Sequence, residues 1–360
     1  MDKRVVLASA GSGKTYYIAH SIKSTERAYI ISFTNRNVEN IIRELNHHYS
    51  NIIPSNIIVS TFDTFVFHQL IKPFSNILEI VDMDILGVDV VNKPEVDGRK
   101  PNYKPLSDPA HYMNSNQQLY VNRMSKLFMK QSASIKNTIL RRIEKYCDII
   151  YFDEFQDYNG FDFKVLEYII EESNLNVIAV GDIFQSLVVP IRNNGNGSNK
   201  PFTDINHVND LTKHFSKNIK IDTDTLNNSR RVTKNVAKFI RENLNINIGS
   251  ISDLDGNIKW IDRIDDINKL MLDKNITKLV WNKKSIVSPM VNCVNWSYSK
   301  GDTYKETCVI LTNKTSNLCD WGNLEPSTRN KLYVALTRAK ENVYMISKSA
   351  FDKWKKSLRN

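Results

Sequence analysis

Short apolar runs alternate with amphipathic segments along most of the chain. Runs rich in β-branched and aromatic residues predict β-strands, whereas apolar residues at helical spacing predict α-helices. In the first half, the expected strands are Val5–Leu7, Ala28–Phe33, Ile57–Thr61, Asp148–Phe152 and Asn176–Val180, and the expected helices include Arg36–Tyr49 and Phe161–Glu172. Because strands and helices alternate, the sequence predicts an α/β fold whose parallel sheet carries helices on both faces.

Two segments interrupt this alternation. Between about residues 73 and 145 the chain is rich in proline and continues as a polar helical segment, which predicts an insertion into the first domain. The segment Asn193–Asn199 contains mostly asparagine and glycine and predicts a loop. The alternation resumes near Asn218, with expected strands Lys278–Trp281, Thr307–Leu311 and Asn342–Ser347 and expected helices Thr233–Leu244 and Ser327–Arg338. We therefore predict two α/β domains, at residues 1–217 and 218–360.

The net positive charge of the chain indicates that its partners carry negative charge. The formal charge is +10 at pH 7, and between Lys93 and Lys145 there are eleven Lys and Arg residues but only four Asp and Glu residues. Such a surface attracts nucleic acids, although it also attracts membranes and acidic proteins. The basic stretch therefore has two interpretations, as part of a nucleic-acid groove or as a solvated basic face.

Other features of the composition exclude several classes of protein. Apolar residues make up 41% and charged residues 24% of the chain, as is usual for soluble globular proteins. No run approaches the roughly 18 apolar residues of a membrane span. Because a phosphate-binding motif begins at Ala8, we expect no cleaved leader. The four cysteines form no C-x-x-C pair, which predicts free thiols in a cytoplasmic protein.

The most specific motif is ASAGSGKT, at residues 8–15, directly after the first apolar run. It fits the phosphate-loop pattern G-x-x-x-x-G-K-[ST], except that Ala8 replaces the first glycine. In such a loop the glycines let successive backbone N–H groups point at one phosphate. The lysine then neutralises the β- and γ-phosphates, and the threonine hydroxyl binds Mg²⁺. Gly11, Gly13, Lys14 and Thr15 therefore predict a nucleoside triphosphate site at the start of a helix.

A pair of adjacent carboxylates forms the second motif. Asp153 and Glu154 follow the apolar strand that ends at Phe152, and they begin the sequence DEFQD. In phosphate-loop enzymes, an aspartate at a strand end holds Mg²⁺ together with the loop threonine. A neighbouring carboxylate can accept a proton from the attacking water. After a phosphate loop, this pair predicts hydrolysis of the triphosphate.

Three further segments carry little information by themselves. Gln185 follows the strand-end sequence VGDIF, Gly301 lies in SKGDTY before an expected strand, and Arg338 lies within YVALTRAK. A turn after a strand, a turn before a strand and a surface arginine would explain them equally well. The amide of Gln185 could contact a γ-phosphate.

Together with three more segments, these motifs resemble those of the UvrD/Rep-type superfamily 1 helicases. The added segments are SFTNR at residues 32–36, STFDTF at residues 60–65 and LNNSR at residues 226–230. DEFQD and YVALTRAK are specific to that group, whereas the phosphate loop is not. The resemblance extends over residues 5–347 and implies two RecA-like domains with ATP in the cleft between them.

The resemblance also implies roles for individual residues. The residues that it assigns to ATP binding are Ala10, Gly11, Ser12, Gly13, Lys14, Thr15 and Gly301. It assigns Thr15 and Asp153 to Mg²⁺, Glu154 to the catalytic base, Gln185 to the γ-phosphate, and Arg230 and Arg338 to arginine fingers that reach across from the second domain. It assigns Phe33, Thr34, Asn35, Thr61 and Phe62 to single-stranded DNA. Core packing is the alternative interpretation of the two phenylalanines.

Several positions depart from the pattern of that family. Leu187–Pro190 replace the aromatic residues that stack on DNA, and Ser229 replaces the tyrosine of an Asn-Tyr-Arg sequence. The glutamine motif that recognises adenine is missing before the first strand, which leaves the choice of base open. Both accessory segments are short, so we expect a compact two-domain motor with a reduced accessory insertion in the second domain.

Three functional hypotheses remain after these observations. The first is an ATP- and Mg²⁺-dependent DNA helicase that moves along single-stranded DNA in the 3′-to-5′ direction and binds duplex junctions as a monomer. The second is a nucleic-acid-dependent ATPase switch that recruits or gates a replication, repair or nuclease partner without unwinding. The third is a small-molecule kinase, but this hypothesis does not explain the presence of the DEFQD sequence. The asparagine- and isoleucine-rich composition is typical of an AT-rich genome, such as that of a phage or a low-GC bacterium.

Overall fold

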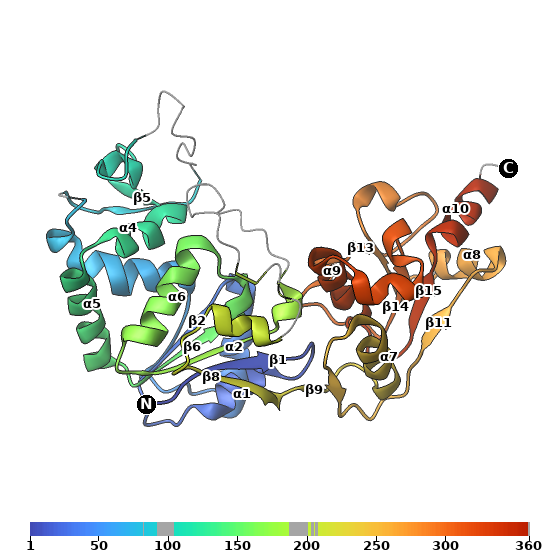
Figure 1. The fold of residues 1–360 in the computed structure, drawn as a ribbon, viewed down its shortest axis with the longest axis horizontal. Helices are drawn as coiled ribbons and strands as arrows, with labels where there is room; N and C mark the ends of the chain where they lie inside the picture. The colour runs from blue at the N-terminus through green and yellow to red at the C-terminus, as the bar shows by residue number, and fades with distance from the viewer. Residues whose placement is uncertain (82, 92–103, 187–200, 203–204, 206–207, 359–360) are drawn as a thin grey trace.

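The chain folds into two lobes, each built on a parallel sheet (Figure 1). The computed structural model describes residues 1–81, 83–91, 104–186, 201–202, 205 and 208–358. Three features expected from the sequence lie wholly or partly outside the described residues, namely the loop Asn193–Asn199, the segment Leu187–Pro190 and residues 92–103 of the insertion. In the part that is described, the expected α/β fold with parallel sheets is confirmed.

The first lobe is organised around a six-stranded sheet with the order β3-β2-β6-β7-β1-β8, in which every neighbouring pair is parallel. Its strands are β1 (Lys3–Ala8), β2 (Ala28–Ser32), β3 (Ile57–Thr61), β6 (Ile149–Asp153), β7 (Asn176–Gly181) and β8 (Lys220–Leu226). The main helices on this sheet are α1 (Lys14–Ser21), α2 (Asn35–His48), α5 (Ala133–Tyr146) and α6 (Gly160–Glu172).

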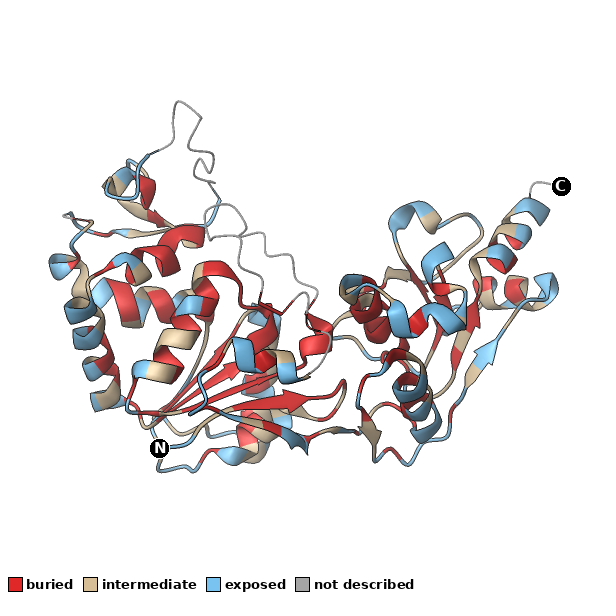
Figure 2. Ribbon diagram, viewed as in Figure 1, coloured by how far each residue is buried: buried red, intermediate tan, exposed pale blue. Residues whose placement is uncertain are grey.

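Successive residues of these strands face opposite sides of the sheet, as the pleat requires. Val6 and Ile30 pack in the cluster that includes Ile18 of α1 and Leu45 of α2. Their neighbours Val5 and Ile31 pack on the other face, in the cluster that holds the apolar residues of α5 and α6. Both faces of the sheet are therefore covered at its centre, which explains why the inner strands β2, β6 and β7 consist of nearly unbroken apolar runs and are almost entirely buried (Figure 2). The edge strands β3 and β8 are partly exposed.

The expected insertion forms a small layer at the far end of the first lobe (Figure 1). The described part of residues 73–145 contains the two-stranded parallel sheet of β4 (Gly87–Asp89) and β5 (Gln118–Tyr120), the short helix α4 (Met124–Lys130) and nearly all of α5. It is preceded by α3 (Phe62–Phe65) and a π-helix at Val66–Ile71, and its last part, α5, packs in the main core of the first lobe. Because α4 packs on α6, the insertion lies away from the second lobe.

The second lobe contains a five-stranded parallel sheet with the order β11-β15-β14-β12-β13. Its strands are β11 (Ile258–Trp260), β12 (Ile276–Val280), β13 (Cys293–Asn295), β14 (Glu306–Ile310) and β15 (Val343–Ile346), and its helices are α7 (Lys234–Leu244), α8 (Ile264–Leu272), α9 (Pro326–Leu336) and α10 (Lys348–Ser357). Apolar residues of α8 and α10 form one core with the sheet. The apolar residues of α7 and α9 pack on the other face and join the core of the first lobe.

The connection between the lobes follows β8. This strand pairs with β1 in the first sheet, although it lies beyond residue 217, at which we expect the first domain to end. The chain then forms β9 (Asn228–Ser229), which pairs with β10 (Gly249–Ser250). As a result, the loops after β1, β6 and β7 and the segment before α7 meet where the lobes adjoin. None of the described helices has both the length and the apolar character that a membrane span requires.

Candidate active site

The phosphate loop adopts the backbone that its glycines allow. Gly11 and Gly13 have φ angles of 74° and 92°, in the left-handed region that residues with a Cβ rarely adopt. The loop follows β1 and leads into α1 at Lys14. Gly11 is also constrained by its surroundings, because a Cβ there would lie 2.6 Å from Cβ of Arg231. The loop therefore has the shape of an anion site and directly contacts the segment that precedes α7.

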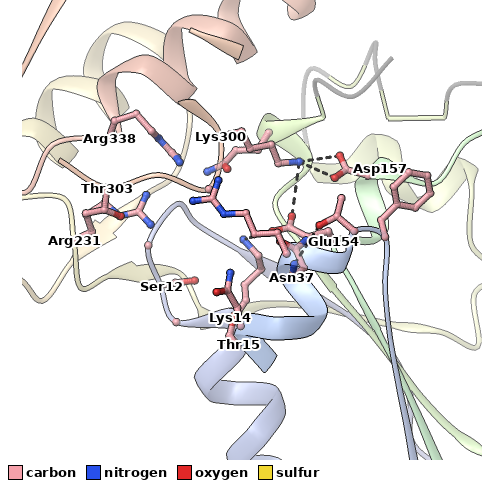
Figure 3. Close-up of a pocket in the computed structure, with 18 of the residues that line it drawn as sticks. Ser12, Lys14, Thr15, Asn37, Glu154, Asp157, Arg231, Lys300, Thr303 and Arg338 are labelled. Atoms are coloured by element: carbon pink, nitrogen blue, oxygen red, sulfur yellow. Dashed lines mark hydrogen bonds and ion pairs between the residues drawn. The ribbon is translucent and has the colours of Figure 1, made fainter. Parts of the chain in front are cut away.

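The two lobes together line a pocket of about 1290 Å³ above this loop (Figure 3). It contains most of the residues that the sequence assigned to nucleotide binding and hydrolysis. These are Gly11, Ser12, Gly13, Lys14, Thr15, Glu154, Gln185, Arg230, Gly301 and Arg338. The structure thus brings together, at one place, residues from opposite ends of the chain.

Ala10 and Asp153 do not line this pocket. The N–H of Ala10 donates a hydrogen bond to the hydroxyl of Tyr333 at 3.0 Å and is not directed at a phosphate. Asp153 ends β6 and is buried, and its Oδ2 accepts a hydrogen bond from Ser32 at 2.9 Å. Burial raises the pKa of Asp153 to about 7, and the neighbouring Glu154 carboxylate adds to this effect.

The environment of Asp153 fits a divalent cation. Its Oδ1 is buried and has no hydrogen-bond partner among the described residues, which is unfavourable unless another group occupies its lone pairs. Thr15, the other expected ligand, lies in the first turn of α1 and lines the pocket. No group of three or more His, Cys, Asp or Glu side chains in the described ranges could hold a metal ion by itself. Mg²⁺ would therefore depend on phosphate oxygens for much of its coordination.

Glu154 lies between two lysines that come from different lobes. Its Oε1 is 3.4 Å from Nζ of Lys14, and its Oε2 is 3.9 Å from Nζ of Lys300. Burial alone would raise the pKa of Glu154, but the charges of Lys14 and Lys300 lower it to about 2. The residue has a φ of 53°, an unusual backbone conformation for a residue with a side chain. Glu154 is therefore ionised at neutral pH and held in a tight turn at the edge of the pocket.

Lys300 connects the lobes through a second carboxylate. Its Nζ is 2.8 Å from both side-chain oxygens of Asp157, the last residue of DEFQD (Figure 3). A second ion pair joins Asp302 of the same loop to Arg36 at 2.7 Å. The Asp157 pair is mostly buried, whereas Arg36 is exposed, so we expect the Asp157 pair to contribute more to the association of the lobes. The sequence contained Lys300 in SKGDTY, but nothing in that pattern indicated a partner in DEFQD.

Arg338 lines the pocket but most of its donors are occupied. Its Nε donates to the carbonyl of Val334 at 2.9 Å, and one terminal nitrogen donates to the carbonyls of Ser299 and Asp302 at 3.4 and 3.3 Å. The other terminal nitrogen donates to Oγ1 of Thr337 at 3.1 Å. Burial lowers the pKa of Arg338 to about 9, so the guanidinium stays charged at neutral pH. These bonds attach the loop that carries Lys300 to the end of α9.

The two consecutive arginines before α7 have different environments. Arg230 is exposed, and its guanidinium lies 5.0 Å from the ring centroid of Tyr16. Arg231 lies against Gly11, donates to the carbonyl of Thr337 at 3.2 Å and points toward Arg338 (Figure 3). Sequence reasoning selected Arg230 and did not consider Arg231, and both line the pocket. A Cβ at Gly13 would lie 3.9 Å from Nε of Arg230, so this arginine also lies near the phosphate loop. The arginine doublet was the available signal for Arg231, but only the structure shows its contact with Gly11.

The residues expected to bind DNA are divided between the surface and the core. Phe33 and Thr34 line the pocket, whereas Asn35, Thr61 and Phe62 do not. Thr34 caps α2 by accepting a hydrogen bond from the N–H of Asn37, and Thr61 caps α3 in the same way. The Phe62 side chain is only 1% exposed and packs edge-on against Tyr158. This arrangement corresponds to the core-packing interpretation of Phe62.

Comparisons with known proteins give a consistent result. A family profile described as "AAA domain" matches residues 2–190, and one described as "Viral superfamily 1 RNA helicase core domain" matches residues 114–347. No curated protein sequence matches the chain. Among solved structures, the arterivirus nonstructural protein 10 (helicase) is similar with a TM-score of 0.52 and 13% identity, over 96% of this chain and 59% of that one.

Two further solved structures have lower scores. The complex of the arterivirus helicase with DNA has a TM-score of 0.49 and 13% identity, over 100% of this chain and 63% of that one. The helicase of PRRSV has a TM-score of 0.46 and 13% identity, over 96% of this chain and 52% of that one. The present chain therefore spans less than two thirds of the length of each of these proteins. At such identities the similarity concerns the fold.

Proposed function

We propose that this chain, which belongs to the superfamily 1 helicase family, hydrolyses a nucleoside triphosphate between its lobes while it moves along single-stranded nucleic acid. The observation that carries the proposal is the composition of the pocket. Lys14 and Glu154 of the first lobe meet Lys300 and Arg338 of the second lobe there, together with Arg231. Cations from two lobes around one phosphate loop suit a triphosphate whose charge both lobes neutralise.

The roles of the residues in the first lobe follow from their positions. Lys14 and the N–H groups at the start of α1 would bind the β- and γ-phosphates of ATP. Thr15 and Asp153 would hold Mg²⁺, which when bound withdraws electron density from the phosphate oxygens. Glu154 is ionised and lies at the pocket edge, so it would accept the proton of the attacking water. The Gln185 amide would orient the γ-phosphate.

The second lobe would respond to the γ-phosphate through its cations. Arg231 lies next to the phosphate loop, and Lys300 is already within 3.9 Å of Glu154. A phosphate group bound at Lys14 would attract both of them, so the closure of the cleft would depend on the triphosphate. Loss of the γ-phosphate after hydrolysis would weaken that attraction and allow the lobes to separate. Repeated closure and opening would move the lobes along a strand.

The finer assignments are also proposals. DEFQD and YVALTRAK support a UvrD/Rep-type motor that acts on DNA in the 3′-to-5′ direction, whereas one matching family profile describes RNA helicases. We propose that the lobes correspond to RecA-like domains at residues 1–217 and 218–360, although β8 of the second range completes the first sheet. The short accessory segments favour a second candidate, an ATPase switch that controls a replication, repair or nuclease partner.

The proposal is tested by measuring phosphate release with no nucleic acid, with single-stranded DNA and with single-stranded RNA. We expect strong stimulation by one of the two strands. Displacement assays on duplexes with a 3′ or a 5′ tail then separate a helicase from a switch. Stimulated hydrolysis without displacement would support the switch, and hydrolysis that neither strand stimulates would contradict both and favour a small-molecule kinase.

A further inference from the structure

We infer that Tyr333 and Gln156 are positioning residues that hold the Glu154 carboxylate through a chain of hydrogen bonds from the phosphate loop. The chain runs from Ala10 through Tyr333, Asp182 and Gln156 to Glu154, and we call it the Ala10–Glu154 chain. It passes from the first lobe to the second and back again. The inference rests on the proposed function, because it concerns the residue that would activate water.

The first links are made by the hydroxyl of Tyr333. This residue belongs to α9 of the second lobe and is fully buried. Its hydroxyl accepts the hydrogen bond from the Ala10 N–H at 3.0 Å and donates to Oδ2 of Asp182 at 3.2 Å. A hydroxyl has one proton to donate, so the two bonds fix its direction. One atom of the second lobe therefore joins the loop after β1 to the loop after β7.

The next links are made around Gln156. The N–H of Asp182 donates to Oε1 of Gln156 at 3.0 Å, and Nε2 of Gln156 donates to Oε2 of Glu154. Flipping the Gln156 amide would lose both hydrogen bonds, because its oxygen would then face the Glu154 carboxylate and its nitrogen would face the Asp182 N–H. The main-chain carbonyl of Gln156 also accepts a hydrogen bond from the Ser186 hydroxyl at 3.1 Å. Gln156 therefore has one orientation, and this orientation aims a donor at Glu154.

The residues of the Ala10–Glu154 chain are buried and closely packed. Gln156 and Asp182 are at most 1% exposed, so no bond in the chain is replaced easily by one to water. A Cβ at Gly181 would lie 2.1 Å from Oε1 of Gln156 and 2.8 Å from the ring of Phe155. Only glycine at this position lets the end of β7 approach the Gln156 amide so closely. The contact between the end of β7 and the Gln156 amide therefore requires Gly181.

The position of Glu154 makes the Ala10–Glu154 chain relevant to catalysis. One carboxylate oxygen lies near Lys14, and the other receives the Gln156 amide and lies 3.9 Å from Lys300. Both lysines have flexible side chains and would be drawn toward a bound phosphate. The Gln156 amide is neutral and would remain on Glu154. Because Asp182 is bound by Tyr333, docking of α9 against the first lobe would keep the amide, and with it the carboxylate, in position.

The test is Tyr333→Phe, which removes the hydroxyl and keeps the ring. We expect the nucleic-acid-stimulated kcat to fall about tenfold, because the base is less well oriented. The KM for ATP and the affinity for a fluorescent ADP should stay within about twofold of the original values. Hydrogen exchange of the segment 152–158, measured on the protein alone, should become faster. Tyr344→Phe is the matched control. Tyr344 lies on β15 of the same lobe, and the substitution removes a hydroxyl that donates to Oε1 of Glu306 on β14, outside the Ala10–Glu154 chain.

A double variant separates positioning from a general loss of stability. In the Glu154→Gln background, adding Tyr333→Phe should not lower the residual turnover further, because the chain acts through Glu154. The inference would be overturned if the two substitutions lowered turnover independently, so that their effects multiplied. Hydrogen exchange in the segment 152–158 that Tyr333→Phe leaves unchanged would also overturn it. If the unaltered protein does not hydrolyse ATP, the proposed function fails, whereas the exchange measurement still tests the chain. Should Tyr333→Phe not fold, Asp182→Asn is the second variant. Its amide oxygen can still accept the Phe184 N–H, but its NH2 group then faces the Tyr333 hydroxyl in place of the Oδ2 acceptor. The same exchange result decides.

Discussion

Replacing Glu154 with glutamine is expected to reduce the steady-state rate of ATP hydrolysis by about 100-fold or more. The amide has nearly the same shape as the carboxylate, but it cannot accept a proton from water. The side chain lies between Lys14 and Lys300 and its pKa is lowered to about 2, so the native group is a free base throughout the neutral range. Phosphate release in the presence of the stimulating strand measures the effect.

The same variant should retain its affinity for the nucleotide. Lys14, Thr15 and the backbone of the phosphate loop are untouched, and ATP binding measured by equilibrium titration is therefore expected to be maintained or slightly strengthened. Glu167→Gln provides the control, because Glu167 lies on α6 outside the pocket. A Glu154→Gln variant that turns over at the native rate would show that another group activates the water.

Substituting Arg231 with alanine is expected to reduce single-turnover hydrolysis by about 100- to 1,000-fold. Its side chain packs against Gly11 and points toward Arg338, so its charge lies between the lobes, where charge would develop on the transferred phosphoryl group. The adjacent Arg230 is a matched control of the same residue type. Arg230→Ala should affect the hydrolytic step less, because that guanidinium lies on the ring of Tyr16.

Rapid mixing of enzyme and ATP with quenching by acid separates the hydrolytic step from binding. If the two alanine variants lose the same activity, or if Arg230→Ala loses more, the assignment of Arg231 is wrong. The Thr337 carbonyl loses a hydrogen-bond donor in Arg231→Ala. For this reason the melting temperature of each variant should be compared with that of the native chain before the rates are interpreted.

The sequence predicted the first lobe well because its signals are local. The phosphate loop, the strand before Asp153 and the alternation of strands and helices each depend on residues that are close in the chain. Parallel strands end at the same edge of a sheet, so motifs that follow β1, β6 and β7 necessarily come together. For the same reason, Lys14, Glu154 and Gln185, which follow the neighbouring strands β1, β6 and β7, are expected to share one pocket.

The contacts between the lobes could not be predicted in this way. Lys300 and Asp157 are 143 residues apart, and nothing in either motif specifies the other as its partner. The contact of Arg231 with Gly11 depends on how the segment before α7 packs on the phosphate loop, and the bond from Ala10 to Tyr333 depends on how α9 packs on the first lobe. Phe62 shows a second limit of sequence reasoning. A phenylalanine at a strand end has the same sequence pattern whether it stacks on a base or packs in the core, where Phe62 lies.

The close approach of Gly11 to Arg231 has a consequence for the engineering of such proteins. A phosphate loop is commonly regarded as a module that works with any partner domain. Here an added methyl group at Gly11 would collide with Arg231 at 2.6 Å, in addition to disfavouring the backbone conformation. A transplanted phosphate loop with any larger residue at this position would thus disturb the packing of the second lobe even if it still held phosphate. In this chain, such a change in the loop would require a compensating change in the surface opposite it.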